Sequence, residues 1–375
     1  MSPLVIEGRL GGSGLTVAIK DTIDVAGWPT RCGSRALQHA LPAPNNATVV
    51  QALLDGGWQV IGKTVLHELA FGVTGINEWA GTPVNPQAPE RIPGGSSSGS
   101  AVIVAQGIAD VALGTDTGGS VRMPAACCGV FGLKPTFGRL SREGVHPVSS
   151  SLDCVGPMAR DLDTLVAAMS AMDSTFVAQT PGAQLHVGLV DVTCDPAIES
   201  AIREAITHRG WTWERVTLPL LDQAFEAALT VINAETWAAF GHFTGQGLLG
   251  ADIEARLLRA AATDATALNA AESVRVAFSA QVDQLLSRFD TLVLPGLPRL
   301  PPLLADVQRG EPVLDLTRFL RPFNLSGHPA LSVPVAYPDS TLSTSLQLIG
   351  RKGDDAQLCA MAGVSLNKPV DARHQ

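Results

Sequence analysis

Short apolar runs alternate along this chain with longer segments in which apolar residues recur at helical spacing. The short runs predict buried strands at residues 15–19, 58–61, 111–113, 186–190 and 291–294. The longer segments predict helices at residues 47–54, 100–108, 162–172, 197–208 and 267–288. Strands that alternate with helices in this way are typical of the α/β fold class.

The absence of linker-like sequence limits the number of domains that we expect. No Pro/Ser-rich or charged linker divides the 375 residues, which predicts one large domain over residues 1–375. Residues 183–290 are rich in alanine and carry few turn signals. We interpret residues 183–290 as a helical lobe of that domain.

Two glycine-rich segments, residues 94–100 and 114–120, each contain one serine of interest, Ser96 and Ser120. A Gly/Ser run alone is typical of a flexible linker. Here the apolar residues 101–105 follow the first run at once, and a predicted strand leads into the second. Open α/β sheets bind ligands where strands end in such turns. Glycine lets bare N–H groups approach a ligand closely, and an attacked carbonyl needs such donors for its oxyanion. The pattern predicts a serine hydrolase.

The same two segments carry a specific family resemblance. The chain closely resembles the amidase signature family from about residue 15 to residue 160, and again at residues 321–330 and 346–350. The motifs that carry it are Pro93-Gly94-Gly95-Ser96-Ser97-Ser98-Gly99-Ser100-Ala101 and Gly114-Thr115-Asp116-Thr117-Gly118-Gly119-Ser120-Val121-Arg122. The resemblance implies a central mixed β-sheet flanked by helices. It also implies hydrolysis of a small carboxamide to a carboxylic acid and ammonia.

The resemblance also implies roles for particular residues. Ser120 matches the nucleophile, Ser96 the bridging serine with a cis peptide bond, and Lys20 the base of a Ser–Ser–Lys triad that forms an acyl-enzyme. The N–H groups of four consecutive residues match the oxyanion donors, and a separate segment matches the lining of the acyl pocket. These residues are Thr117, Gly118, Gly119 and Ser120 for the oxyanion, and Ala70, Phe71 and Gly72 for the pocket.

The position of Lys20 favours it over two other lysines as the base. A lysine that accepts a proton near neutral pH must have a lowered pKa, which burial provides. Lys20 ends an apolar run, whereas Lys63 precedes a helix start as a solvated or capping charge, and Lys134 precedes Pro135 in a turn. Side chains alternate between the faces of a strand, so Asp21 should point away from Lys20.

Arg122 and the pair Cys127-Cys128 lie close to the nucleophile in sequence. The Arg122 guanidinium would fit a substrate carboxylate, but we interpret it as structural and paired with Asp116. A cysteine thiolate could serve as a nucleophile here. We prefer the interpretation that both cysteines are small apolar fillers of a short helix.

Other functions remain open at this stage. Residues 57–64, Gly57-Trp58-Gln59-Val60-Ile61-Gly62-Lys63-Thr64, fit the pattern of a nucleotide-binding P-loop, although their middle residues favour a strand. The eight histidines are scattered without metal-ligand spacing, so we assign no metal and no cofactor. The remaining alternative is a non-catalytic partner subunit, which has kept the fold and lost the catalytic activity.

Charge and cysteine usage narrow the class of partner. The net charge of −9 opposes binding to nucleic acid, so we expect a small-molecule amide as the ligand.

No signal peptide or membrane span is evident, which predicts a cytoplasmic protein. The six cysteines show no C-x-x-C spacing and are expected to be reduced thiols. The segment that precedes Lys20 is shorter than in the family that the chain resembles. Some members of that family use this segment for dimer contacts, so the sequence leaves open whether the protein is a homodimer.

Overall fold

A computed structural model describes residues 2–180 and 184–363, and Ala183, the first residue of the predicted helical lobe, lies outside them. The described residues form an 11-stranded sheet in the order β1-β3-β2-β4-β6-β5-β10-β11-β9-β7-β8. Its strands are β1 (Leu4–Gly11), β2 (Thr16–Lys20), β3 (Gln59–Thr64), β4 (Val111–Asp116), β5 (Phe131–Lys134), β6 (Cys154–Ala159), β7 (His186–Val190), β8 (Thr212–Val216), β9 (Thr291–Pro295), β10 (Ala330–Ala336) and β11 (Ser343–Ile349). The sheet is mixed, because β2 pairs in parallel with β3 and β4 whereas β4 pairs antiparallel with β6.

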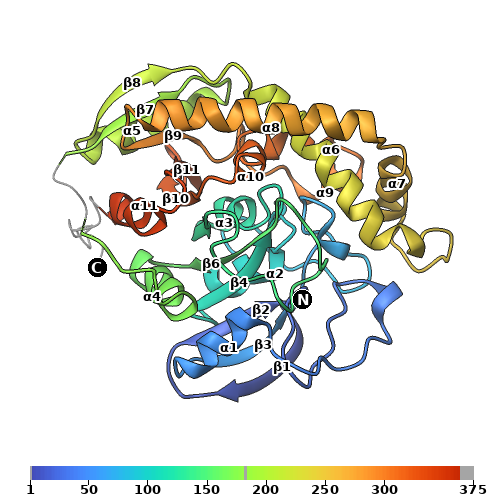
Figure 1. Cartoon of the computed structure of the whole chain (residues 1–375). Coiled ribbons are helices and arrows are strands. Elements are labelled where there is room, and N and C mark those ends of the chain that lie inside the picture. Colours follow the sequence, from blue (N-terminus) through green and yellow to red (C-terminus); the bar gives the residue numbers. More distant parts are fainter. Residues whose placement is uncertain (1, 181–183, 364–375) are drawn as a thin grey trace.

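Helices flank this sheet, so the predicted α/β fold with a central mixed sheet is confirmed (Figure 1). The helices are α1 (Thr48–Asp55), α2 (Ser98–Ala105), α3 (Arg122–Cys128), α4 (Leu162–Met172), α5 (Pro196–His208), α6 (Leu221–Phe240), α7 (Ala251–Ala260), α8 (Ala265–Leu286), α9 (Leu304–Gln308), α10 (Pro322–Leu325) and α11 (Asp355–Ala362). Figure 1 shows α6 and α8 side by side along one side of the molecule. No helix within the described ranges combines the length and the apolar character that crossing a membrane requires.

The predicted elements fall within a few residues of the observed ones, and their boundaries have local causes. Helix α4 begins where the side chain of Asp161 accepts a hydrogen bond from the Thr164 N–H, and α8 begins where Asp264 accepts one from Ala267. Residues 184–290 hold β7 and β8 of the sheet as well as α5 to α8. A purely helical lobe is therefore too simple a description of this stretch.

Strand β4 lies in the middle of the core and determines where the site forms. All six of its residues are buried. Val111 and Leu113 pack into one hydrophobic cluster and Ala112 into another, so β4 has apolar layers on both faces. Since β2 runs parallel to β4 with Ile19 opposite Leu113, both strands end at the same edge of the sheet. Lys20 therefore comes beside the glycine-rich segment that follows β4.

Candidate active site

Lys20 and Ser96 meet at that edge of the sheet. Lys20 is fully buried, and its Nζ donates hydrogen bonds to Ser96 Oγ and Thr115 Oγ1, both at 2.8 Å. The peptide bond between Gly95 and Ser96 is cis. The structure thus joins two of the predicted triad residues, although 76 positions separate them in the sequence.

Burial changes the acid–base behaviour of Lys20. Desolvation lowers the pKa of Lys20 to about 8, against the opposing effect of the negative charges of Asp153 and Asp116. Asp21, which follows Lys20, forms an ion pair with Lys63 instead, at 2.8 Å between Oδ1 and Nζ. Near neutral pH, Lys20 is therefore neutral in a far larger fraction of molecules than an ordinary lysine, and in that form it can accept a proton.

Ser120 lies where the segment after β4 contacts the segment of Ser96. The Ser97 N–H donates to the Ser120 carbonyl at 3.2 Å. Within the described residues, no hydrogen bond joins the side chains of Ser96 and Ser120. Ser120 lines a cavity of about 60 Å³ together with Ala70, Phe71 and Gly72. The structure therefore places the segment expected to line the acyl pocket beside the expected nucleophile.

The expected oxyanion donors are not equivalent in the structure. The Gly119 N–H donates to Asp116 Oδ1 at 2.7 Å, so a nearby carboxylate already uses it. This corrects the expectation for Gly119, and it leaves the N–H groups of Thr117, Gly118 and Ser120 as the candidates. Thr117 is held in turn by a 2.8 Å hydrogen bond from its Oγ1 to Asp153 Oδ1.

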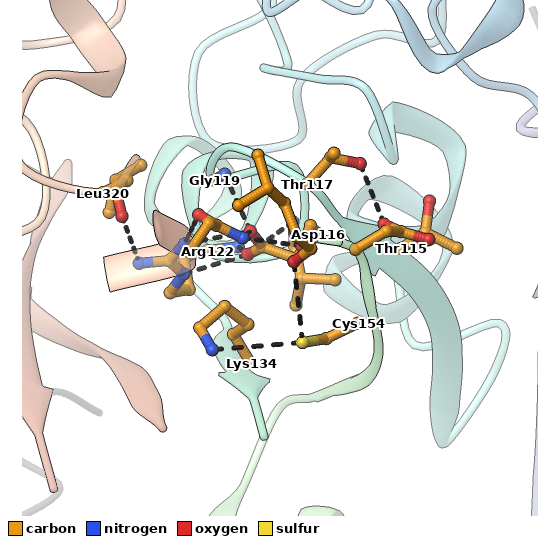
Figure 2. Close-up of polar contacts among 12 residues, drawn as sticks. Thr115, Asp116, Thr117, Gly119, Arg122, Lys134, Cys154 and Leu320 are labelled. Carbon is orange, nitrogen blue, oxygen red and sulfur yellow. Dashed lines mark hydrogen bonds and ion pairs between the residues drawn. The ribbon is translucent and has the colours of Figure 1, made fainter. Parts of the chain in front are cut away.

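A buried ion pair between Asp116 and Arg122 supports this segment (Figure 2). Arg122 donates from Nε and Nη2 to the two carboxylate oxygens of Asp116, each at 2.9 Å, and from Nη1 to the Leu320 carbonyl. Burial by itself would raise the pKa of Asp116, but the charge and hydrogen bonds of Arg122 outweigh it and hold the pKa well below the usual range. The interpretation of Arg122 as structural agrees with these contacts.

Replacing Arg122 with methionine is therefore expected to destabilise the protein by about 3–5 kcal/mol, because the Asp116 carboxylate would be left buried without its partner. Urea unfolding measures the change in the free energy of unfolding. Arg215→Met is the control, since Arg215 is half exposed where it pairs with Asp191 and Glu199. Equal losses of stability in the two variants would contradict the structural role of Arg122.

Lys63 and Lys134 have different surroundings from those predicted. Both are fully buried, so Lys63 is not a solvated or capping charge, and Lys134 is the last residue of strand β5. Lys63 donates to Thr30 Oγ1 at 2.7 Å besides its ion pair with Asp21. Because β3 includes Lys63 and extends over Gln59–Thr64, these residues do not form the phosphate-binding loop of the P-loop interpretation.

Cys127 and Cys128 belong to α3 and pack in a hydrophobic cluster. Burial raises the pKa of both thiols well above the usual range, so neither is a ready thiolate nucleophile. Among the residues that the structure describes, no group of three His, Cys, Asp or Glu side chains could hold a metal ion.

Sequence reasoning did not assign roles to three residues near the site: Thr115, Asp153 and Arg321. Thr115 accepts a hydrogen bond from Lys20, Asp153 holds Thr117, and Arg321 lines the cavity beside Ser120. Thr115 and Arg321 lie inside the family motifs, so their positions in the sequence could have marked them as site residues. Asp153 carried no such signal.

The fold and the paired serine segments define an enzyme of the hydrolase class. The family model described as Amidase matches residues 11–359. The chain is 34% identical over 424 residues to the A subunit of the glutamyl-tRNA(Gln) amidotransferase of Methanococcoides burtonii, covering 98% of this chain and 87% of that protein. The chain therefore belongs to the amidase signature family, and it is an amidase that hydrolyses the C–N bond of linear amides.

Solved structures agree with this assignment. The A subunit of the glutamyl-tRNA(Gln) amidotransferase of Thermotoga maritima superimposes with a TM-score of 0.83 at 29% identity, over 96% of this chain and 86% of that one. Allophanate hydrolase of Kluyveromyces lactis superimposes with a TM-score of 0.84 at 28% identity, over 96% of this chain and 63% of that one.

Proposed function

We propose that this enzyme hydrolyses a small carboxamide to a carboxylic acid and ammonia through an acyl-enzyme on Ser120. Ser96 and Lys20 complete the proposed triad. The observation that carries the proposal is the 2.8 Å hydrogen bond from the buried Lys20 to Ser96, in a segment that contacts the segment of Ser120. A lysine whose pKa is about 8 suits the role of base near neutral pH.

In the first half of the reaction, Ser120 Oγ bonds to the amide carbon while its proton passes through Ser96 to neutral Lys20. In this proposal, the N–H groups of Thr117, Gly118 and Ser120 donate hydrogen bonds to the resulting oxyanion. The C–N bond then breaks, and the nitrogen takes the proton back through Ser96 and leaves as ammonia. Water attacks the ester in the second half by the same proton route and releases the acid.

The small size of the substrate is supported by the cavity of about 60 Å³ beside Ser120. A panel of amides scored by ammonia release tests the proposal, together with intact-mass analysis after treatment with a fluorophosphonate. We expect turnover of at least one short amide and a single covalent adduct. No ammonia from any amide, or an adduct that persists in Ser120→Ala, would contradict the proposal.

A second candidate function follows from the relatives. Proteins named as the A subunit of glutamyl-tRNA(Gln) amidotransferase match nearly the whole chain at about one third identity. This chain would then be one component of an amidotransferase and work with a protein partner. Amide hydrolysis by the purified chain at a rate that added partner proteins do not change favours the free-standing amidase, and strict dependence on a partner favours the amidotransferase component.

Side-chain bulk at two glycines tests whether catalysis depends on the position of the segment that precedes Ser120. A Cβ at Gly119 would lie 2.9 Å from Leu320 Cβ, and the residue has a φ of +116°, whereas a Cβ at Gly118 would meet Ile232 at 3.0 Å without that backbone conflict. We expect Gly119→Ala to lower kcat by about 100-fold through displacement of the segment and Gly118→Ala to lower it less. Steady-state kinetics measure kcat of both variants. A larger loss of kcat in Gly118→Ala than in Gly119→Ala would contradict the prediction.

A further inference from the structure

One charged group in the cavity beside Ser120 has no role in the chemistry described above. Arg321 lines this cavity and is only 3% exposed. Its Nε and Nη1 are buried and have no hydrogen-bond partner within the described residues. The Phe225 ring, with its centroid 4.4 Å from Arg321 Cζ, covers one face of the guanidinium. Such stacking uses none of the five N–H donors of an arginine.

The position of Arg321 relates it to the reacting centre. A Cβ at Gly118 would lie only 3.3 Å from Arg321 Nε, so the guanidinium lies against one of the three candidate oxyanion donors. Arg321 immediately precedes α10, whose Asn324 donates to Asp116. The side chain is therefore held beside the site by its stacking on Phe225 and by the anchoring of α10, rather than free to turn into solvent.

The charge around the cavity is unbalanced. Arg256 also lines the cavity, and its nearest acidic partner, Asp252, lies 3.8 Å away. No carboxylate is among the described residues that line the cavity. Burial lowers the pKa of Arg321 to about 10, against the opposing negative charge of Glu226, which makes no hydrogen bond or ion pair with it, and at this pKa the guanidinium stays charged at neutral pH. A buried positive charge without an acceptor is unfavourable unless a ligand supplies one.

We propose that Arg321 binds a carboxylate of the substrate, so that the preferred amide is an anion with a carboxylate a few bonds from the scissile carbonyl. The proposal rests on the proposed function and narrows its substrate class. Arginine presents a planar fork of N–H donors that matches a carboxylate with two parallel hydrogen bonds. The short distance between Arg321 and Gly118 limits the spacer, which favours monoamides of three- to five-carbon dicarboxylic acids.

Matched substrate pairs test the proposal directly. Malonamate, succinamate and glutaramate are each compared with the corresponding diamide, in which a neutral carboxamide replaces the carboxylate without a change of shape. For at least one pair we expect kcat/KM to be roughly 100-fold higher for the anion, which is the scale of a charge-assisted hydrogen-bond pair. Equal values for every pair would overturn the proposal.

Variants then assign the preference to Arg321. Arg321→Met is expected to lower kcat/KM for the anionic substrate by roughly 100-fold and that for its diamide by less than about threefold. Arg318→Met is the matched control on the same segment, because Arg318 is half exposed and pairs with Asp222. Equal losses on both substrates would show that Arg321 acts on the fold or the oxyanion, and would overturn the proposal.

A binding measurement separates this inference from the proposed function and covers the case in which Arg321→Met does not fold. Calorimetry measures the binding of succinate or malonate to Ser120→Ala, and it requires no catalysis. In the double variant Ser120→Ala/Arg321→Lys we expect this binding to be at least tenfold weaker, because lysine keeps the positive charge but lacks the planar fork of N–H donors of arginine. Fluorophosphonate labelling of Ser120 with no dicarboxylate binding would refute the inference alone. Dicarboxylate binding without labelling would refute the proposed function alone.

Discussion

Ser120→Ala is expected to lower kcat by about 10⁴-fold or more and to abolish the fluorophosphonate adduct, because no other group would bond to the amide carbon. The fold should be retained, since the hydrogen bond that ties Ser120 to the Ser96 segment is made by its backbone carbonyl, which accepts from the Ser97 N–H. Ammonia release and intact-mass analysis measure both effects.

Ser98→Ala is the matched control for this prediction. Ser98 lies in the other glycine-rich segment, is fully buried, and its hydroxyl has no hydrogen-bond partner within the described residues. We expect it to keep most of the activity and the adduct. An adduct that persists in Ser120→Ala, or that disappears in Ser98→Ala, would mean that the nucleophile has been misassigned.

Lys20→Met should reduce kcat by a similar factor, because Ser96 would lose the group that receives the proton. In the unaltered enzyme, the fraction of Lys20 that is neutral and able to act as base falls as the pH drops below its pKa of about 8. We therefore expect kcat/KM to rise about tenfold per pH unit below that pKa and to level off above it. A pH–rate profile measures this, and a profile that is flat between pH 6 and 8 would contradict the assignment.

The stability of Lys20→Met gives a second readout with a definite sign. The folded state lowers the pKa of Lys20 below its ordinary value of 10.5, so the unfolded chain binds the proton more tightly. Lys20 consequently destabilises the folded state below pH 8, and this destabilisation disappears as the pH rises towards 10.5. Lys20→Met should thus lose activity without a fall in thermal stability at pH 7.

Lys63→Met is the contrasting variant, and the structure changes what is expected of it. The Asp21 carboxylate would be left buried without its partner, so we expect a loss of about 3–5 kcal/mol of unfolding free energy. Activity per folded molecule should change far less than in Lys20→Met. A catalytic defect in Lys63→Met alone, with Lys20→Met active, would reverse the two assignments.

Several parts of the fold and the site could be predicted from local sequence. Strands such as His186–Val190 and helices such as Leu162–Met172 are continuous in sequence and show their periodicity there. The strands that were missed, including Cys154–Ala159 and Ser343–Ile349, contain Gly, Pro or polar residues inside the sheet. Their neighbours on both sides, rather than their own composition, stabilise them as strands.

The sequence by itself determined the family, the two serine segments and the position of Lys20 at the end of an apolar run, because these properties lie within short stretches of chain. Only the tertiary structure decided which groups meet. The parallel pairing of β2 with β4 brings Lys20 to Ser96, and Asp116 takes the N–H of Gly119. Arg321 reaches the cavity from a segment 201 positions after Ser120. Such contacts depend on strand register and on the packing of distant segments, and no local pattern of residues records either.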